Sequence, residues 1–248
     1  MKLHTRIALA LALTSLAISS PACAEHRIGG KSISDVFKDP GLAEITDAGC
    51  RGDTKTVARL AAIGVDPNGP GLDSVPPIFW AIHCENLAGM EALLKAGANP
   101  NYFIPGKFSI TYQAATYRNP RILQLILKYG GDPNAGDDWN EWAIKAVIFD
   151  AYDTDDWGKY YTILDSNFEI NKADSLGSTV AIILASGDRW DKVEELLDRG
   201  YNYNLQDLAG YLEFLGPGGR KVKDAKERVA KRLEAMGYKV PDWLGRKK

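Results

Sequence analysis

Apolar side chains recur at helical spacing in four segments of this 248-residue chain. In each segment they occupy positions i, i+3 and i+4, which places one apolar stripe toward a core. A glycine follows each stripe, and only glycine adopts the left-handed conformation at a helix end without steric cost, so each helix is expected to end there. The stripes are Val57, Leu60, Ala61; Met90, Leu93, Leu94; Ile122, Leu125, Ile126; and Val193, Leu196, Leu197.

Each of these glycines begins a short phrase that repeats along the chain. The phrase reads Gly-Val-Asp-Pro-Asn from Gly64, Gly-Ala-Asn-Pro-Asn from Gly97 and Gly-Gly-Asp-Pro-Asn from Gly130, and these glycines are spaced by 33 residues. Variant copies begin at Asn167 and Gly200. In the first three copies a proline blocks continuation of the helix. A fixed period of this length predicts a repeat array in which each unit buries its apolar face against its neighbours.

A second, shorter helix is expected upstream of each stripe. It is clearest in residues 174–185, where Thr179 is a predicted helix cap and Gly177 a turn residue. Residues 75–82 and 109–115 are its counterparts. Small residues near the ends of these segments favour a close approach of neighbouring units.

This pattern resembles the ankyrin-repeat family, whose unit is a helix pair and a β-turn in 33 residues. Residues 174–185 look like the family's Asp-x-x-Gly-x-Thr-Pro-Leu-His-Leu-Ala-Ala line, and the glycine phrases look like its Gly-Ala-Asp-x-Asn ending. The resemblance implies an all-α solenoid of about five to six helix-turn-helix units, with short β-turn connections and a C-terminal capping helix. It covers residues 41 to about 205 in five units (41–72, 73–105, 106–138, 139–173 and 174–205), which a degenerate capping repeat with a basic tail (206–248) follows. Residues 25–40 are expected to form an N-terminal extension before the first unit.

The fourth unit departs from the period. Asn167 stands 37 residues after Gly130, which is four more than 33, and the surplus fits residues 152–157, between the two helices of that unit. Seven acidic residues fall within 137–157, against one lysine. Their spacing differs from that of an EF-hand calcium loop, so a solvated acidic loop and a protein-contact loop are the two interpretations that remain.

The N-terminus has the form of a secretory signal. Lys2 and Arg6 precede an apolar stretch over 7–18 and a small-x-small site at 22–24, so residues 1–24 are expected to be removed and the mature chain to reach the periplasm. Lipid anchoring at Cys23 is the alternative, disfavoured because the leucine usual in such sites is missing. In an oxidising compartment the remaining Cys50 and Cys84 favour a disulfide, and two inert buried thiols are the alternative.

The net charge and the lack of catalytic and metal-binding motifs disfavour several classes of function. Without the signal the chain has 28 basic and 32 acidic residues, a net charge near −4 that disfavours bulk nucleic-acid binding. The mature chain has two histidines, His26 and His83, and the sequence contains no HExxH, paired CxxC or Walker motif. We therefore expect no enzymatic activity, no metal and no cofactor.

The resemblance also implies where a partner would bind. In ankyrin-like arrays the β-turn tips and the ends of the first helices line the concave binding surface. Aromatic residues in exposed turns are typical of interfaces, so Trp139 and Trp157 are expected to contact the partner and Trp142 to lie in the core. The candidate partner-binding residues are Tyr102, Phe103, Lys107, Asp137, Asp138 and Trp139 in turns, His83, Thr116, Tyr117, Phe149 and Asp150 at helix ends, and Asp153, Asp155, Asp156 and Trp157 in the acidic segment.

Exported ankyrin-repeat proteins of this size resemble two kinds of bacterial envelope protein. One is the immunity protein that neutralises a secreted antibacterial effector such as a phospholipase, and the other is a protective protein acting beside catalase in oxidative stress. We expect a non-enzymatic binding protein of the first kind, with the second as the alternative. Its partner is expected to be a protein with a basic or mixed-charge surface, without nucleic acid or a membrane span, and the chain is expected to be a monomer. Tethering to anionic lipid by the basic residues of 220–248 is a third interpretation.

Overall fold

The computed structural model describes residues 27–136, 142–216 and 219–242, and the predicted signal peptide lies outside them. The described residues form thirteen α-helices and no strand, which confirms the all-α prediction for this part of the chain. The helices are α1 (Ile33–Val36), α2 (Pro40–Arg51), α3 (Thr54–Ala62), α4 (Pro77–His83), α5 (Leu87–Lys95), α6 (Ile110–Thr116), α7 (Pro120–Lys128), α8 (Ala143–Thr154), α9 (Gly158–Leu164), α10 (Val180–Ser186), α11 (Trp190–Asp198), α12 (Leu205–Leu215) and α13 (Arg220–Ala235), with a short 3-10 helix at Leu72–Ser74.

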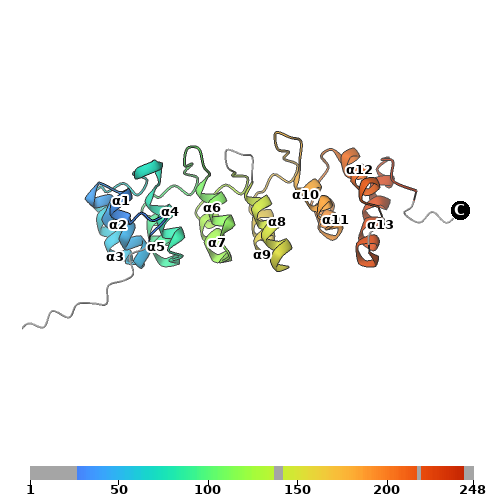
Figure 1. Cartoon of the computed structure of the whole chain (residues 1–248). Coiled ribbons are helices and arrows are strands. Elements are labelled where there is room, and N and C mark those ends of the chain that lie inside the picture. The colour runs from blue at the N-terminus through green and yellow to red at the C-terminus, as the bar shows by residue number, and fades with distance from the viewer. Residues whose placement is uncertain (1–26, 137–141, 217–218, 243–248) are drawn as a thin grey trace, which may run out of the picture.

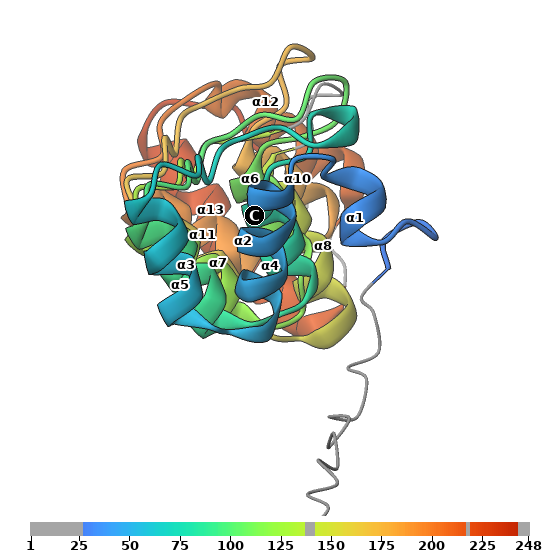
Figure 2. The same cartoon turned by 90° about the vertical axis from the view of Figure 1, so that its left-hand side faces the viewer.

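From α2 onward the helices form consecutive pairs that stand side by side in an extended row (Figure 1). The first helices of the pairs (α2, α4, α6, α8, α10 and α12) form one layer and the second helices form the other, as the end-on view shows (Figure 2). One continuous hydrophobic core runs between the layers, from Ile45 in α2 to Leu233 in α13. Where the structure describes them, the loops that join one pair to the next project on the same side of the row, at the top of Figure 1.

Three of these loops are narrow hairpins, each closed by an isolated antiparallel bridge. The bridges join Phe103 to Ser109, Gly136 to Trp142 and Ala173 to Thr179. The last bridged residue of each loop is the N-cap of the helix that follows, so the hairpin sets the start of that helix. Thr179 accepts a hydrogen bond from the backbone of Ile182, which confirms its predicted role as a cap.

The last asparagine of the repeated phrase joins each unit to the next. The Asn101 side chain donates to the carbonyl of Gly130 at 2.8 Å and accepts from the backbone N–H of Asp132 at 2.7 Å. Asn68 makes the same two contacts one unit earlier, to Gly97 and Asn99. We call Asn68, Asn101, Asn134 and Asn171 the asparagine ladder, because the last two also accept backbone N–H groups of the following unit.

The other residues of the phrase shape the turn that presents the ladder. Gly64, Gly97, Gly130 and Gly200 have φ between 89° and 100°, which confirms that each takes the left-handed conformation at a helix end. In the first three copies the side chain two residues before the ladder asparagine accepts its backbone N–H, as Asp132 does for Asn134 at 2.8 Å. The period of 33 residues is therefore the sequence separation between successive asparagines of the ladder in these copies.

The fourth unit accommodates its four extra residues by lengthening a helix. Its first helix α8 has 12 residues, whereas α4, α6 and α10 have seven each. The prediction of an acidic loop over 152–157 was therefore wrong for its first half, because α8 continues to Thr154 and ends at Asp155, whose φ is 56°. Trp157 is the N-cap of α9, so little chain is left between the two helices.

The N-terminal extension covers the first end of the row. The short helix α1 has a capping box between Ser32 and Asp35. Behind it, Phe37 is 2 % exposed and packs in a second hydrophobic cluster with Val36 and Trp80. Residues 27–37 therefore bury an apolar face that an open array end would expose to water.

Close contact between the first two units depends on two glycines. A Cβ atom built on Gly89 of α5 would lie 1.7 Å from the carbonyl oxygen of Gly49 in α2. Since both contacting groups belong to helix backbones, no side-chain rotation relieves such an overlap. These glycines thus allow α2 and α5 to approach more closely than ordinary helix packing permits.

Replacing the ladder residue Asn101 should weaken the contact between units two and three. Asn101→Ala removes one donor and one acceptor and leaves two backbone groups without their partner, so we expect a loss of about 1–2 kcal/mol in the free energy of unfolding, measured in urea. Thr116→Ala, at an exposed hydroxyl that bonds only within its own helix, should change it by less than about 0.5 kcal/mol. Equal effects of the two substitutions would contradict this role.

Gly89→Ala should destabilise the chain although alanine is the better helix former. The added methyl group overlaps the backbone of Gly49, and we expect a loss of about 3 kcal/mol, measured by chemical unfolding. Gly210→Ala in α12 is the matched control, because a Cβ atom there meets nothing within 4 Å. That variant should be more stable than the wild type by roughly 0.5–1 kcal/mol.

Candidate functional site

A strip of aromatic side chains crosses the first-layer helices of units two and three. Phe79 of α4 stacks on Phe108 in the hairpin that leads into α6, with 6.1 Å between ring centroids. Phe79 also stacks on His83 one turn further along α4, and Phe108 packs against Tyr112 of α6 at 6.2 Å. We call Phe79, His83, Phe108, Tyr112 and Tyr117 the aromatic strip. His83 is exposed and the other four side chains are half-buried, so the strip presents ring surface to the solvent.

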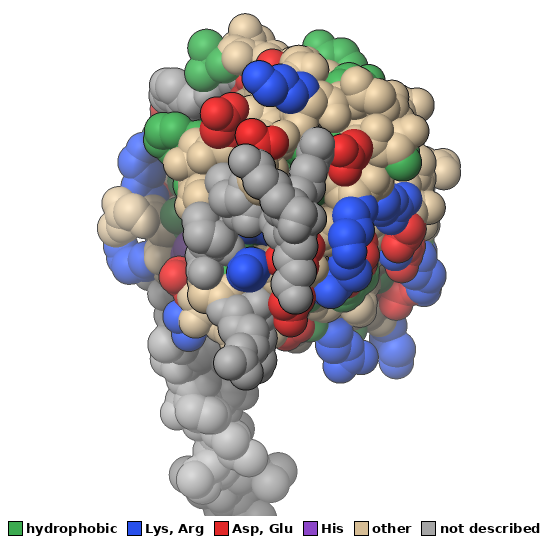
Figure 3. Space-filling model, turned by 90° about the vertical axis from the view of Figure 1, so that its right-hand side faces the viewer, with side chains coloured by type: hydrophobic (Ala, Val, Ile, Leu, Met, Phe, Trp, Pro, Cys, Tyr) green, Lys and Arg blue, Asp and Glu red, His purple; other side chains and the backbone are tan. Residues whose placement is uncertain are grey.

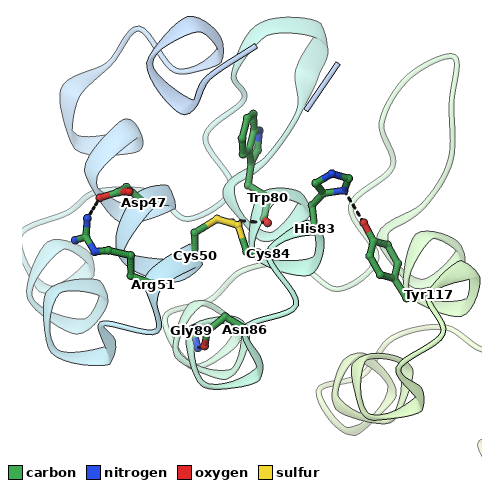
Figure 4. The surroundings of a disulfide bond; sticks show 9 residues. All are labelled: Asp47, Cys50, Arg51, Trp80, His83, Cys84, Asn86, Gly89 and Tyr117. Carbon is green, nitrogen blue, oxygen red and sulfur yellow. Dashed lines mark hydrogen bonds and ion pairs between the residues drawn. A yellow bond between two sulfur atoms is a disulfide. The ribbon is translucent and has the colours of Figure 1, made fainter. Parts of the chain in front are cut away.

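His83 and Tyr117 join the ends of two first-layer helices. The Nδ1 atom of His83 lies 2.7 Å from the hydroxyl oxygen of Tyr117, and the two rings meet edge to face (Figure 4). Burial raises the pKa of Tyr117 above its ordinary value, so the phenol is neutral at neutral pH and can donate to Nδ1. This contact fixes two of the predicted partner-binding residues in one orientation.

A disulfide lies directly beside the strip. Cys50 at the end of α2 and Cys84 after α4 are bonded, with 5.3 Å between their Cα atoms (Figure 4). The sequence favoured this pairing, although packed helices usually stand ~8–10 Å apart. The close approach of the first two units at Gly49 and Gly89 brings the cysteines within range. Closing a loop of this length stabilises a fold by roughly 3–4 kcal/mol in the chain-entropy account.

Asp150 belongs to an ion pair inside the row. Its carboxylate lies 2.9 Å from the Nζ atom of Lys159, whose side chain is only 6 % exposed. The same Nζ donates to the carbonyls of Ala115 and Tyr117, at the end of α6. Lys159 therefore satisfies carbonyls that α6 leaves without intrahelical partners, and it holds α9 against the helix of the preceding unit. The Asp150 carboxylate, whose side chain is 26 % exposed, thus takes part in a contact between units.

Trp157 lies in the core, so its prediction as an exposed interface residue was wrong. It is 8 % exposed, and the guanidinium of Arg189 lies 4.1 Å from the centre of its ring. The ring also packs edge to face against Tyr152 and Tyr160. Tyr152, Trp157 and Tyr160 thus pack against one another beside the lengthened helix α8. Trp142 is 6 % exposed, in agreement with its predicted place in the core.

The other acidic candidates remain at the surface. Asp153, Asp155 and Asp156 are all exposed at or after the end of α8, and Asp155 lies 3.9 Å from Arg189. Phe149, one turn before Asp153, is 50 % exposed. The lengthened α8 therefore carries an exposed phenyl ring and three carboxylates at its C-terminal end.

The predicted turn residues are divided between surface and core. Phe103 is 41 % exposed on its hairpin, Lys107 is half-buried, and Tyr102 packs partly against the core. Thr116 is exposed at the end of α6. Asp137, Asp138 and Trp139 lie outside the described residues.

The sequence reasoning missed three members of the strip. Phe79 and Tyr112 are 33 residues apart, so both occupy the third position of a first-layer helix, one turn before His83 and Thr116. The period could have identified this pair, because positions i and i+4 lie on one helix face. Phe108 lies one residue before the N-cap Ser109, and nothing in its local sequence signals its contact with Phe79.

Two searches of the described residues bear on other functions. No group of three or more histidine, cysteine, aspartate or glutamate side chains is placed to hold a metal ion in the part of the chain that the structure describes. Within the same ranges, every helix is too short or too polar to cross a bilayer. Most of the candidate partner-binding residues at the surface gather in two places, the aromatic strip and the exposed end of α8.

Comparison with known proteins does not assign this chain to a family. No family model matches the sequence, and no curated protein matches it either.

Removing the buried ammonium group should test the structural role of Asp150. Lys159→Met leaves the carboxylate and the α6 carbonyls without their partner, so we expect a loss of about 3 kcal/mol in the free energy of unfolding. Adding Asp150→Asn to this variant should restore part of the loss, because the second substitution removes the uncompensated charge. Lys231→Met at an exposed position of α13 is the control, and a comparable loss there would refute the assignment.

Proposed function

We propose that this chain is an exported ankyrin-repeat protein that binds another protein with the surface formed by its first-layer helices and hairpins. The ankyrin assignment is supported by the 33-residue period, by the helix pair in each unit and by the hairpins between pairs. The asparagine ladder supports it further, because it explains why one phrase has to recur in every unit.

The aromatic strip is the observation that carries the binding function. Four half-buried rings and one exposed imidazole lie next to one another on two units and are fixed by mutual contacts. Rigid aromatic side chains offer a large contact area at a small cost in conformational entropy, and they are enriched among the residues that dominate binding energy. A surface of this kind suits a protein partner better than it suits a small polar ligand.

The charges beside the strip indicate the sign of the partner's surface. Asp153, Asp155 and Asp156 are exposed at the end of α8, within one unit of Tyr117. Exposed carboxylates at the rim of an interface raise the rate of association with a basic partner more than they raise the affinity. We therefore propose a partner with a basic or mixed-charge contact surface.

The disulfide and the N-terminal pattern support an exported location in an oxidising compartment. A bond between Cys50 and Cys84 suits an oxidising compartment, and residues 1–24 have the succession of a secretory signal. A periplasmic protein that binds by surface occlusion fits the role of an immunity protein, which neutralises a secreted antibacterial effector such as a phospholipase. We propose this role for the chain.

The partner can be identified by affinity capture. The disulfide-bonded chain from residue 25 onward is immobilised and exposed to periplasmic extract and to purified secreted effectors, and the bound protein is identified by mass spectrometry. Capture of an effector, together with loss of its toxicity when the chain is present, would support the immunity role. Capture of a catalase would replace that role with the protective alternative.

Phe149→Ala should weaken binding of the captured partner by about 30-fold, equivalent to about 2 kcal/mol, if the first-layer surface is the interface. Because Phe149 is half exposed, thermal stability should change little. The matched control is Ile63→Ala, an exposed apolar residue that follows the second-layer helix α3.

Asp153→Lys combined with Asp155→Lys should slow association of the partner and make the association rate less dependent on salt concentration. Wild-type binding by both the Phe149→Ala variant and the double lysine variant would rule out the α8 end of this surface as part of the interface.

A further inference from the structure

A second apolar surface lies at the C-terminal end of the row. A groove of about 690 Å³ runs between the hairpin before α10 and helix α12, and its walls include Leu176, Ile182, Tyr211 and Phe214. Leu176 is 89 % exposed and Phe214 is 84 % exposed, more than any other large hydrophobic side chain in the described ranges. Figure 3 looks onto this end, where hydrophobic side chains are exposed along the upper edge, on the side of the hairpins.

The groove exists because the last unit lacks a hairpin. In earlier units 13 residues separate the left-handed residue from the start of the next helix, as from Gly97 to Ile110 and from Asn167 to Val180. In the last unit only five separate Gly200 from Leu205, which is eight fewer. The hairpin that ends at Thr179 therefore has no following hairpin beside it.

Neighbouring hairpins inside the row do bond to one another. The backbone N–H of Ser109 donates to the carbonyl of Gly136 in the next hairpin at 3.2 Å. The asparagine ladder also ends before α12. Asn204 occupies the position of the earlier ladder asparagines, but its side chain donates to Asp207 in the helix that it caps. The edge of the last hairpin and the side of α12 thus form an open groove where a following hairpin is missing.

We propose that this groove binds an extended, apolar segment of the partner protein, which takes the place of the missing hairpin. Leu176 and Phe214 would lose their exposure to water on binding, which favours an apolar segment. Asp207 is the only charged side chain among the groove residues, so a lysine or arginine on the segment would complement it. This inference rests on the proposed binding function and adds a second contact, which recognises an unfolded or loop segment of the partner.

The groove can be tested with a defined probe, a phage-displayed library of random 12-residue linear peptides. Selection on the chain from residue 25 onward should enrich peptides with apolar residues at alternate positions and one basic residue, because side chains of an extended segment alternate between two faces. Phe214→Glu and Leu176→Asp should each weaken the binding of enriched peptides at least tenfold, and Asp207→Asn should reduce the preference for the basic residue. Met236→Glu, at an exposed position after α13, should leave binding unchanged, and all four variants should melt like the wild type.

Several results would overturn the proposal. Failure to enrich any peptide, or enriched peptides that bind Phe214→Glu normally, would show that the groove is not a seat for an extended segment. Light scattering that finds a dimer broken by Phe214→Glu would assign the groove to a second copy of the chain. A rise in peptide affinity on deleting residues 243–248 would assign it to the chain's own C-terminal residues, which include Trp243 and Leu244.

The captured partner separates this inference from the proposed function. If Phe149→Ala weakens its binding and Phe214→Glu does not, the groove proposal fails and the binding function remains. If neither variant changes its binding, both proposals fail.

Discussion

The asparagine ladder is the interaction on which the rest of this structure depends. Each ladder side chain satisfies backbone groups of the following unit, as Asn101 does for Gly130 and Asp132. The partners of the asparagine are backbone groups, which every residue type provides. The contact can therefore recur from unit to unit only if the turn that presents the asparagine keeps the same shape. The glycine with positive φ and the carboxylate or amide two residues before the asparagine provide that shape. The helices then stack at a fixed spacing, and their apolar stripes meet in one continuous core.

A fixed spacing between units also determines what the surface can do. Side chains of α4 are brought next to side chains that flank α6 in the following unit, and the aromatic strip from Phe79 to Tyr117 arises from these contacts. Contacts between the rings, the His83–Tyr117 hydrogen bond and the neighbouring disulfide hold the strip in one arrangement. A partner that docks on it therefore meets a surface that is already ordered, and less conformational entropy is lost on binding.

The two irregular units give the array its individual features. In unit four the extra residues lengthen α8, and the space this creates is filled by Trp157, Tyr152 and Tyr160, while Phe149 and Asp153 reach the surface at its end. In the last unit the absence of a hairpin leaves Leu176 and Phe214 exposed at the side of the row. The exposed end of α8 and the groove beside α12 thus lie where the repeat departs from its regular pattern, whereas the aromatic strip lies on two regular units.

The sequence by itself determined the helices, their ends and the period, because these depend on local spacing: apolar residues three and four apart, a glycine that takes positive φ, and a threonine that caps its own helix. It also indicated His83, Tyr117 and Phe149 as surface residues from their places in the repeat. Only the tertiary structure decided that Trp157 is buried, that Asp150 pairs with Lys159, and that Cys50 reaches Cys84. These outcomes depend on how closely neighbouring units approach and on which side chains fill the space between them, as the contact of Gly89 with Gly49 shows. Such distances arise from packing between segments about 30 residues or more apart, and no local pattern of residues encodes them.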